Sequence, residues 1–243
     1  MAQNPLIRTA FRPEQIRKRH TLLEITDAGR KTIIDELAEN DGISAELLEK
    51  ITLLLLPENP GFRTPGIVRR EETDLRAGYI PIGFSAPVAG EDGRLRVAAF
   101  VACKDVERAI SPYDVLKMSF SDRTASMRAL FGAVELAGEL GLKPGIWGSA
   151  ALELYTGLPC THDESDLDLL VETAPLETLS RFLEGIRTLE ERFGLRIDVE
   201  VDLSDGYGVQ LKELLGRGSM VLGKSINGVS LFPREHLLAA LPH

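Results

Sequence analysis

The chain has 243 residues, with 28 Lys+Arg against 37 Asp+Glu and a formal net charge of −9. Apolar residues make up 44%, which excludes a disordered chain and allows one large domain or two small ones. The negative net charge argues against a protein that binds nucleic acid through its overall charge. Two cysteines indicate no disulfide framework. Because no targeting or membrane-length apolar segment is visible, we expect a cytoplasmic protein without a membrane partner.

The first half of the chain predicts two helices followed by extended segments. Asp27 and Ser44 can each cap a helix, and the apolar spacing after them is helical. Polar and apolar residues alternate too little in the segment 95–102 for a surface strand, which favours a buried strand. The expected helices cover about 27–39 and 45–55, and the expected strands 66–70, 79–84 and 95–102.

The second half alternates strands and helices, which is typical of an α/β or α+β domain. Ser111-Pro112 begins a helix, Gly141 ends a long one, and Asn227-Gly228 predicts a hairpin turn. A domain boundary is weakly marked between 100 and 115, and we expect domains 1–105 and 106–243. Helices are expected at 123–140, 150–155, 175–193 and 211–215, and strands at 144–147, 166–171, 195–203, 220–222 and 229–232.

The acidity is concentrated toward the C-terminus. Residues 143–243 hold 9 Lys+Arg against 16 Asp+Glu, a net of −7, and the first 142 residues hold 19 against 21, a net of −2. Such an imbalance is usually a solvated acidic surface. It is also what a cluster of carboxylates around a cation would produce.

A Gly-Ser pair lies between an expected strand and an expected helix, at Gly148-Ser149. A glycine there lets the backbone approach a phosphate, and the helix N-terminus offers free N–H groups. The Ser149 hydroxyl adds a further donor. Trp147, just before the pair, is expected to pack.

Acidic residues alternate with apolar ones on the two following strands. Asp166 and Asp168 share one strand face, and on the third strand Asp198, Glu200 and Asp202 share another. Neighbouring carboxylates repel each other unless a divalent cation lies between them. If the strands are adjacent, Asp198 or Glu200 becomes a third ligand, and the set could hold two Mg²⁺ ions. An exposed acidic strand is the simpler alternative for an isolated Asp-Leu-Asp.

Gly-Ser followed by Asp-x-Asp and a third strand carboxylate resembles the nucleotidyltransferase (polymerase-β-like) superfamily. The longer strings resemble the phosphoribosyl-dephospho-CoA transferase of malonate decarboxylase, also called malonate decarboxylase holo-acyl-carrier-protein synthase. The resemblance runs from about Arg19 onward. It is carried by residues 147–153, 156–159 and 165–170, and more weakly by 19–23, 68–70, 80–83 and 221–224.

The resemblance implies an α+β fold, with a nucleotidyltransferase-like mixed sheet flanked by helices and a smaller α/β N-terminal domain. It implies transfer of phosphoribosyl-dephospho-CoA from a triphosphoribosyl-dephospho-CoA donor to a serine of an apo acyl carrier protein, with loss of pyrophosphate. Asp166, Asp168 and Asp198 would hold Mg²⁺, with Asp198 activating the serine. Donor phosphates would meet the residues Gly148, Ser149, Arg69, Arg70 and Lys224, although the three basic ones could equally be surface charges.

Three rival functions remain open at this level. The first is another nucleotidyltransferase that acts on a small molecule or a protein. The second is a non-catalytic nucleotide-binding module of the same fold. The third is a structural or interaction protein, supported only by the helical N-terminal insertion. Loss of one carboxylate would favour the second, and none of Asp166, Asp168 and Asp198 is lost here.

Overall fold

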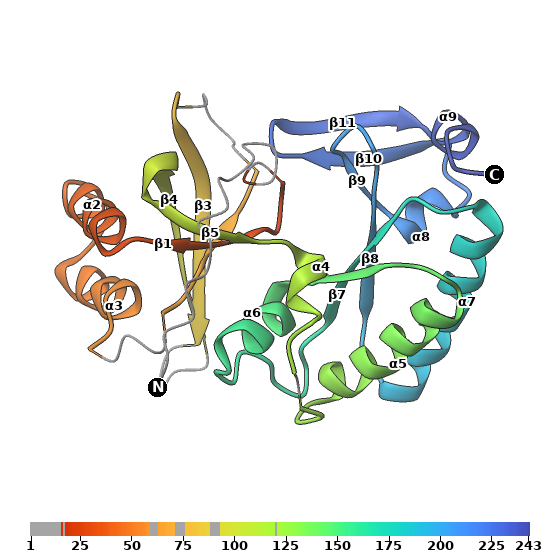
Figure 1. The fold of residues 1–243 in the computed structure, drawn as a ribbon, viewed down its shortest axis with the longest axis horizontal. Coiled ribbons are helices and arrows are strands. Elements are labelled where there is room, and N and C mark those ends of the chain that lie inside the picture. Colours follow the sequence, from red (N-terminus) through yellow and green to blue (C-terminus); the bar gives the residue numbers. More distant parts are fainter. Residues whose placement is uncertain (1–15, 17, 59–62, 71–75, 88–92, 120) are drawn as a thin grey trace, which may run out of the picture.

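The computed structural model describes residue 16 and residues 18–58, 63–70, 76–87, 93–119 and 121–243. These residues form two sheets that lie beside each other along the longest axis of the molecule (Figure 1). The first is a five-stranded antiparallel sheet in the order β4-β3-β2-β1-β5. Its strands are β1 (Leu22–Ile25), β2 (Gly66–Val68), β3 (Tyr79–Pro87), β4 (Arg94–Ala102) and β5 (Val106–Ile110).

The described residues of the N-terminal unit also include the helices α2 (Asp27–Ala38) and α3 (Ala45–Leu55). Ser44 caps α3 as predicted, because its side chain accepts from the Leu47 N–H. In α2 the cap is Thr26 rather than Asp27, and its hydroxyl accepts from the Gly29 N–H. The unit has its own core, which includes Ile33, Ile51 and Phe84.

The second sheet has six strands in the order β11-β10-β9-β8-β7-β6. Strands β7 and β8 run parallel, and the other neighbouring strands described run antiparallel. The sheet is therefore mixed, as expected. Its strands are β6 (Pro144–Trp147), β7 (Leu167–Glu172), β8 (Ile197–Asp202), β9 (Gly208–Gln210), β10 (Met220–Ser225) and β11 (Gly228–Pro233).

Helices α5 (Ala125–Glu139) and α7 (Leu176–Phe193) lie side by side against this sheet (Figure 1). Two glycines permit their close approach, because a Cβ at Gly132 would overlap with Leu189 and one at Gly185 with Leu136. The shorter helices are α4 (Pro112–Val115), α6 (Gly148–Thr156), α8 (Leu211–Leu214) and α9 (Arg234–Ala239). No helix among the residues described is both long and apolar enough to span a bilayer.

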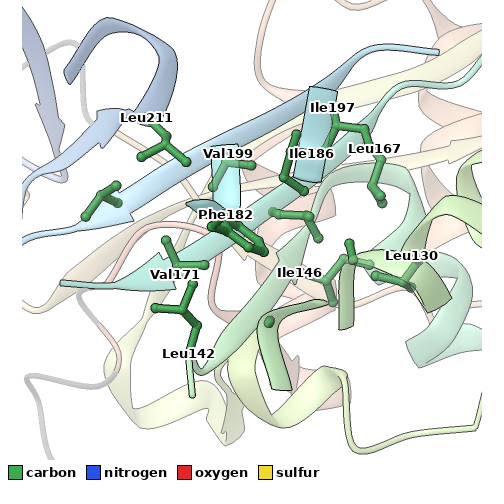
Figure 2. Close-up of a cluster of buried hydrophobic side chains, with 14 of the residues drawn as sticks. Leu130, Leu142, Ile146, Leu167, Val171, Phe182, Ile186, Ile197, Val199 and Leu211 are labelled. Carbon is green, nitrogen blue, oxygen red and sulfur yellow. The ribbon is translucent and has the colours of Figure 1, made fainter. Parts of the chain in front are cut away.

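The larger core lies between the second sheet and its helices. Figure 2 shows Phe182 and Ile186 of α7 among side chains from β7 and β8, including Leu167, Ile197 and Val199. All five side chains are buried. Because successive residues of a strand point to opposite faces, this packing turns the alternating acidic residues to the other face.

Several elements differ from the sequence-based expectation. The prediction that 95–102 is a buried strand is wrong: β4 is an edge strand, where Val97 and Val101 are buried but Arg96 and Ala98 are exposed. Strands β1, β5 and β9 and helix α9 were not predicted, because each is short and gains its stability from neighbouring elements. Strand β5 pairs with β1, so the first sheet continues to Ile110.

Candidate active site

The turn between β6 and α6 strongly favours glycine. Gly148 has φ of +70°, and a Cβ on it would overlap with Oδ2 of Asp168. Both observations disfavour a side chain, the first because L-residues rarely adopt the left-handed region and the second because the Asp168 carboxylate would have to move. The start of α6 therefore lies directly against the Asp168 carboxylate. The predicted Gly-Ser turn and the predicted Asp-x-Asp strand meet at this point.

The predicted carboxylates come together at the start of the two parallel strands. In the register of β7 and β8, Asp168 lies opposite Asp198, and across β6 it lies opposite Trp147. Asp166 precedes β7 on the same face. The Arg196 guanidinium joins the other two acids, with Nη2 2.8 Å from Oδ2 of Asp166 and 2.9 Å from Oδ2 of Asp198.

The electrostatics of Asp168 favour a cation at this site. Burial, followed by the negative charges of Asp166, Asp198 and Glu200, raises the pKa of Asp168 to about 7. A divalent cation beside Asp168 would reverse that shift by favouring the ionised form. Carboxylate oxygens are the ligands that Mg²⁺ prefers, so the donor set fits this ion.

Arg196 already occupies the space between two of these acids. In the part of the chain that the structure describes, no three Asp, Glu, His or Cys side chains converge into a ready-made metal cluster. The side chain of Arg196 is 65% exposed, so it can leave this position without disturbing the core.

Glu200 is held by a different set of partners. It is buried and accepts from Arg19, at 3.2 Å to Nη1 and 3.3 Å to Nη2, while His20 Nε2 lies 3.4 Å from Oε2. Burial alone would raise the pKa of Glu200, but these partners outweigh it and keep the pKa below its ordinary value. Burial also lowers the pKa of His20, so Arg19 is the cation that pairs with Glu200 at neutral pH.

Arg19 and His20 were not predicted as site residues, although they lie in a string on which the family resemblance rests. His20 stacks on Trp147 with ring centroids 4.0 Å apart, so Trp147 packs as expected. His20 is also the non-glycine residue with positive φ, at 67°, among those described. The alternation of β8 does not tell which of its acids is buried, so no sequence signal indicated that Arg19 would reach Glu200.

Ser149 has a partner from the N-terminal unit. Nη1 of Arg94, at the start of β4, donates to the Ser149 hydroxyl at 2.8 Å and to the Cys160 carbonyl at 2.7 Å. Arg94 is thus a third residue near the site that sequence reasoning missed. Cys160 is buried and its pKa is raised by burial, which agrees with a structural role.

The three basic residues predicted to meet phosphates lie in different places. Nζ of Lys224 is 4.0 Å from Oε1 of Glu200, and the Lys224 carbonyl accepts from Arg19. Arg69 and Arg70 directly follow β2 in the first sheet, where the Arg69 N–H donates to the Pro81 carbonyl. The role of Arg69 and Arg70 toward phosphates stays a prediction.

A cavity of about 400 Å³ adjoins this region. Its walls come from both units and include Arg19, His20, Glu200 and Lys224. Two tyrosines, Tyr113 and Tyr207, add aromatic rings to a lining of mixed polarity. The site thus consists of a carboxylate cluster at a glycine turn, beside an interdomain cavity.

Comparison with known proteins gives matches over nearly the whole chain. A family model described as "Phosphoribosyl-dephospho-CoA transferase MdcG C-terminal domain" matches residues 116–235. The corresponding N-terminal domain model matches residues 18–112. No solved structure matches the chain.

Curated relatives carry the name phosphoribosyl-dephospho-CoA transferase. One from Xanthomonas axonopodis pv. citri is 31% identical over 176 residues, which are 72% of this chain and 82% of the relative. One from Bradyrhizobium diazoefficiens is 27% identical over 225 residues, 91% of this chain and 92% of the relative. One from Pseudomonas fluorescens is 28% identical over 161 residues, 66% of this chain and 74% of the relative.

The two-part fold and these matches define an enzyme of the transferase class. The chain belongs to the phosphoribosyl-dephospho-CoA transferase family, whose N- and C-terminal domains correspond to its two sheets.

Proposed function

We propose that this enzyme transfers phosphoribosyl-dephospho-CoA from 2'-(5''-triphosphoribosyl)-3'-dephospho-CoA to a serine of the malonate decarboxylase apo acyl carrier protein. The serine oxygen forms a bond to the α-phosphorus of the donor, and the bond from that phosphorus to the β-phosphate oxygen breaks. Pyrophosphate leaves, the serine proton passes to a carboxylate, and the carrier gains a phosphodiester-linked group. The names of the family and its relatives support the transferred group.

The observation that carries the proposal is the contact between the glycine turn and the carboxylates. Gly148 allows the α6 N-terminus to lie against Asp168, with Asp198 opposite it on β8. Backbone N–H groups at such a turn suit phosphate oxygens. One phosphate could therefore be in reach of both the turn and the acids, which is what attack at the α-phosphorus requires.

Mg²⁺, when bound by Asp166, Asp168 and Asp198, would offset phosphate charge and favour ionisation of the attacking hydroxyl. Ser149 would donate a hydrogen bond to the leaving pyrophosphate, and Asp198 would receive the serine proton. The lysine and arginine candidates Lys224, Arg69 and Arg70 would offset further phosphate charge.

The contacts of Glu200 favour Asp198 as the third carboxylate. Glu200 has both oxygens engaged by Arg19, so using it would leave that guanidinium without its partner. Asp198 is paired instead with the exposed Arg196, whose release costs little because an exposed pair contributes little.

A transfer assay tests the proposal. The enzyme, Mg²⁺, the donor and the apo carrier protein are incubated, and the carrier is weighed by mass spectrometry. We expect a mass gain equal to the phosphoribosyl-dephospho-CoA group on the serine. Asp166→Asn and Asp168→Asn should lower the rate at least 100-fold, whereas Asp163→Asn, in the exposed loop before the motif, should not.

Two outcomes would overturn the proposal. Retained activity in both Asn variants would exclude the carboxylate site. No mass gain with this carrier, together with a gain on another acceptor from ATP, would favour a different nucleotidyltransferase. The family membership weakens the second rival, a non-catalytic module, because the curated relatives are named as transferases.

A further inference from the structure

Arg94 brings a guanidinium of the N-terminal unit to the turn that precedes α6. It lies at the start of β4, and its side chain contacts Ser149, the residue next to Gly148. Nη1 donates to the Ser149 hydroxyl at 2.8 Å and to the Cys160 carbonyl at 2.7 Å, and Nε donates to the Ser85 hydroxyl at 3.1 Å. The guanidinium is therefore held at the turn that would bind the donor phosphates.

The partners of Arg94 leave its positive charge without a negative one. They are two hydroxyls and a carbonyl, and among the residues that the structure describes no carboxylate is ion-paired with it. Three other arginines near the motif are each paired with a carboxylate of the chain: Arg19 with Glu200, Arg123 with Glu153, and Arg196 with Asp166. Because Arg94 is half-buried, its unpaired charge is incompletely solvated, and an anion at the turn would offset that cost.

The guanidinium also retains unused hydrogen-bond donors. An arginine side chain carries five N–H groups, and the contacts of Arg94 use the N–H of Nε and both of Nη1. Nη2 has no acceptor among the described residues, and it is not one of the buried, unsatisfied atoms found there. Its two N–H groups are therefore accessible to a ligand, and guanidinium N–H groups suit phosphate oxygens.

The contact with Arg94 determines how Ser149 can donate. A hydroxyl has one hydrogen and two lone pairs. Because the Ser149 oxygen accepts from Arg94, its own hydrogen points away from the guanidinium and remains available to a phosphate oxygen. Arg94 and Ser149 can thus both donate to phosphates bound at the turn.

We propose that Arg94 is a phosphate-binding residue of the active site and neutralises the phosphates that leave as pyrophosphate. The inference rests on the proposed function and adds a contribution of the N-terminal unit to the chemical step. Negative charge on the leaving pyrophosphate increases as its bond to the α-phosphorus breaks. A cation fixed at the turn therefore stabilises the transition state more than the bound donor.

The test uses inorganic pyrophosphate with Mg²⁺ as the probe, with binding to the full-length protein measured by isothermal titration calorimetry. Arg94→Met removes the charge, and Arg94→Lys keeps it. Arg96→Met is the matched control, because Arg96 is the next residue on the same face of β4 and is exposed. Circular dichroism and the Tm of the free protein verify that each variant is folded.

We expect at least ten-fold weaker pyrophosphate binding by Arg94→Met, an intermediate affinity for Arg94→Lys, and the wild-type affinity for Arg96→Met. In the transfer assay, Arg94→Met should lower kcat at least ten-fold and change the KM for the carrier little. Should Arg94→Met not fold, the Arg94→Lys result decides.

A purely structural link between the two units predicts a lower Tm with unchanged pyrophosphate affinity in the folded variants. That result, or no pyrophosphate binding by the wild type, would overturn the inference, and transfer by the wild type in the carrier assay would then leave the proposed function standing. Pyrophosphate binding that depends on Arg94, without transfer to the carrier, would instead contradict the proposed function alone.

Discussion

At the scale of single residues, the site depends on a glycine that meets two requirements at once. Gly148 and Gly157, at the two ends of α6, have almost the same φ, +70° and +69°. A Cβ on Gly157 would meet no atom within 4 Å, whereas one on Gly148 would overlap with Asp168. Alanine substitutions at the two positions therefore separate the effect of the positive φ from the effect of the contact with Asp168.

We expect Gly157→Ala to destabilise the protein by about 1–2 kcal/mol, the cost of a left-handed L-residue, and to leave transfer nearly unchanged. Gly148→Ala should cost more and lower the transfer rate at least 100-fold, because it displaces the Asp168 carboxylate. Urea unfolding and the transfer assay measure the two effects. Equal losses in both variants would show that the contact with Asp168 is unimportant.

The raised pKa of Asp168 predicts a pH-dependent stability. A carboxyl whose pKa in the folded state is about 7, above its unfolded value, stabilises the fold at low pH and loses that contribution as pH rises through 7. In EDTA, Asp168→Asn should therefore have a higher Tm than the wild type at pH 8, and the difference should disappear near pH 4. A gain of 1 kcal/mol corresponds to roughly 2–4 °C at this chain length. A Tm difference that does not vary with pH would contradict the burial of an ionised Asp168.

At the scale of elements, the contact between α5 and α7 is set by small residues. Gly132 and Gly185 face leucines of the opposite helix, but Gly138, on exposed α5 surface, would meet nothing within 4 Å if it gained a Cβ. Helix propensity favours alanine over glycine by about 1 kcal/mol at any of these positions. The three glycines therefore differ only in whether an added methyl group would contact the partner helix.

Gly138→Ala is accordingly expected to raise the free energy of unfolding by about 0.5–1 kcal/mol. Gly185→Ala should lower it, because the added methyl group overpacks against Leu136. Chemical denaturation gives both values. Adding Leu136→Ala to Gly185→Ala should recover part of the loss, and an additive double mutant would rule out the proposed overlap.

At the scale of the whole molecule, residues of the N-terminal unit bind polar side chains of the second unit. Arg19 and His20 reach Glu200, Arg94 reaches Ser149, and the Tyr155 hydroxyl donates to Glu24 at 2.5 Å. Glu200 is only 2% exposed, and its buried negative charge is paired with Arg19, which belongs to the other unit. The two family domains are therefore linked through the site itself.

Arg19→Met should cost up to about 3–5 kcal/mol of stability at pH 7.5, since it removes the guanidinium from the buried Glu200 and leaves that carboxylate only His20 and the 4.0 Å approach of Lys224. The loss should shrink near pH 4.5, where the carboxyl takes up a proton. Lys18→Met is the matched control: Lys18 is 60% exposed in its pair with Asp202, and we expect an effect below 1 kcal/mol. If both variants lose equal stability, Arg19 does not neutralise Glu200.

Much of the fold could be predicted because its signals are local. Capping at Ser44, the ends of α5 and α7 at glycines, and the turn at Asn227-Gly228 depend on a few neighbouring residues. Strands β1, β5 and β9 could not be predicted, because three to five residues carry too little pattern. The burial of β4 was misjudged because its place in the sheet depends on pairing with β3 alone.

The sequence by itself determined that Asp166 and Asp168 share one face, that Asp198 and Glu200 share one face, and that a Gly-Ser turn precedes them. The period of two along a strand requires no partner, so these conclusions are local. Only the tertiary structure decided that Asp168 lies opposite Asp198 while Glu200 is bound by Arg19, about 180 residues earlier. Strand order and contacts between distant segments follow from the packing of the whole chain, which no short window of sequence contains.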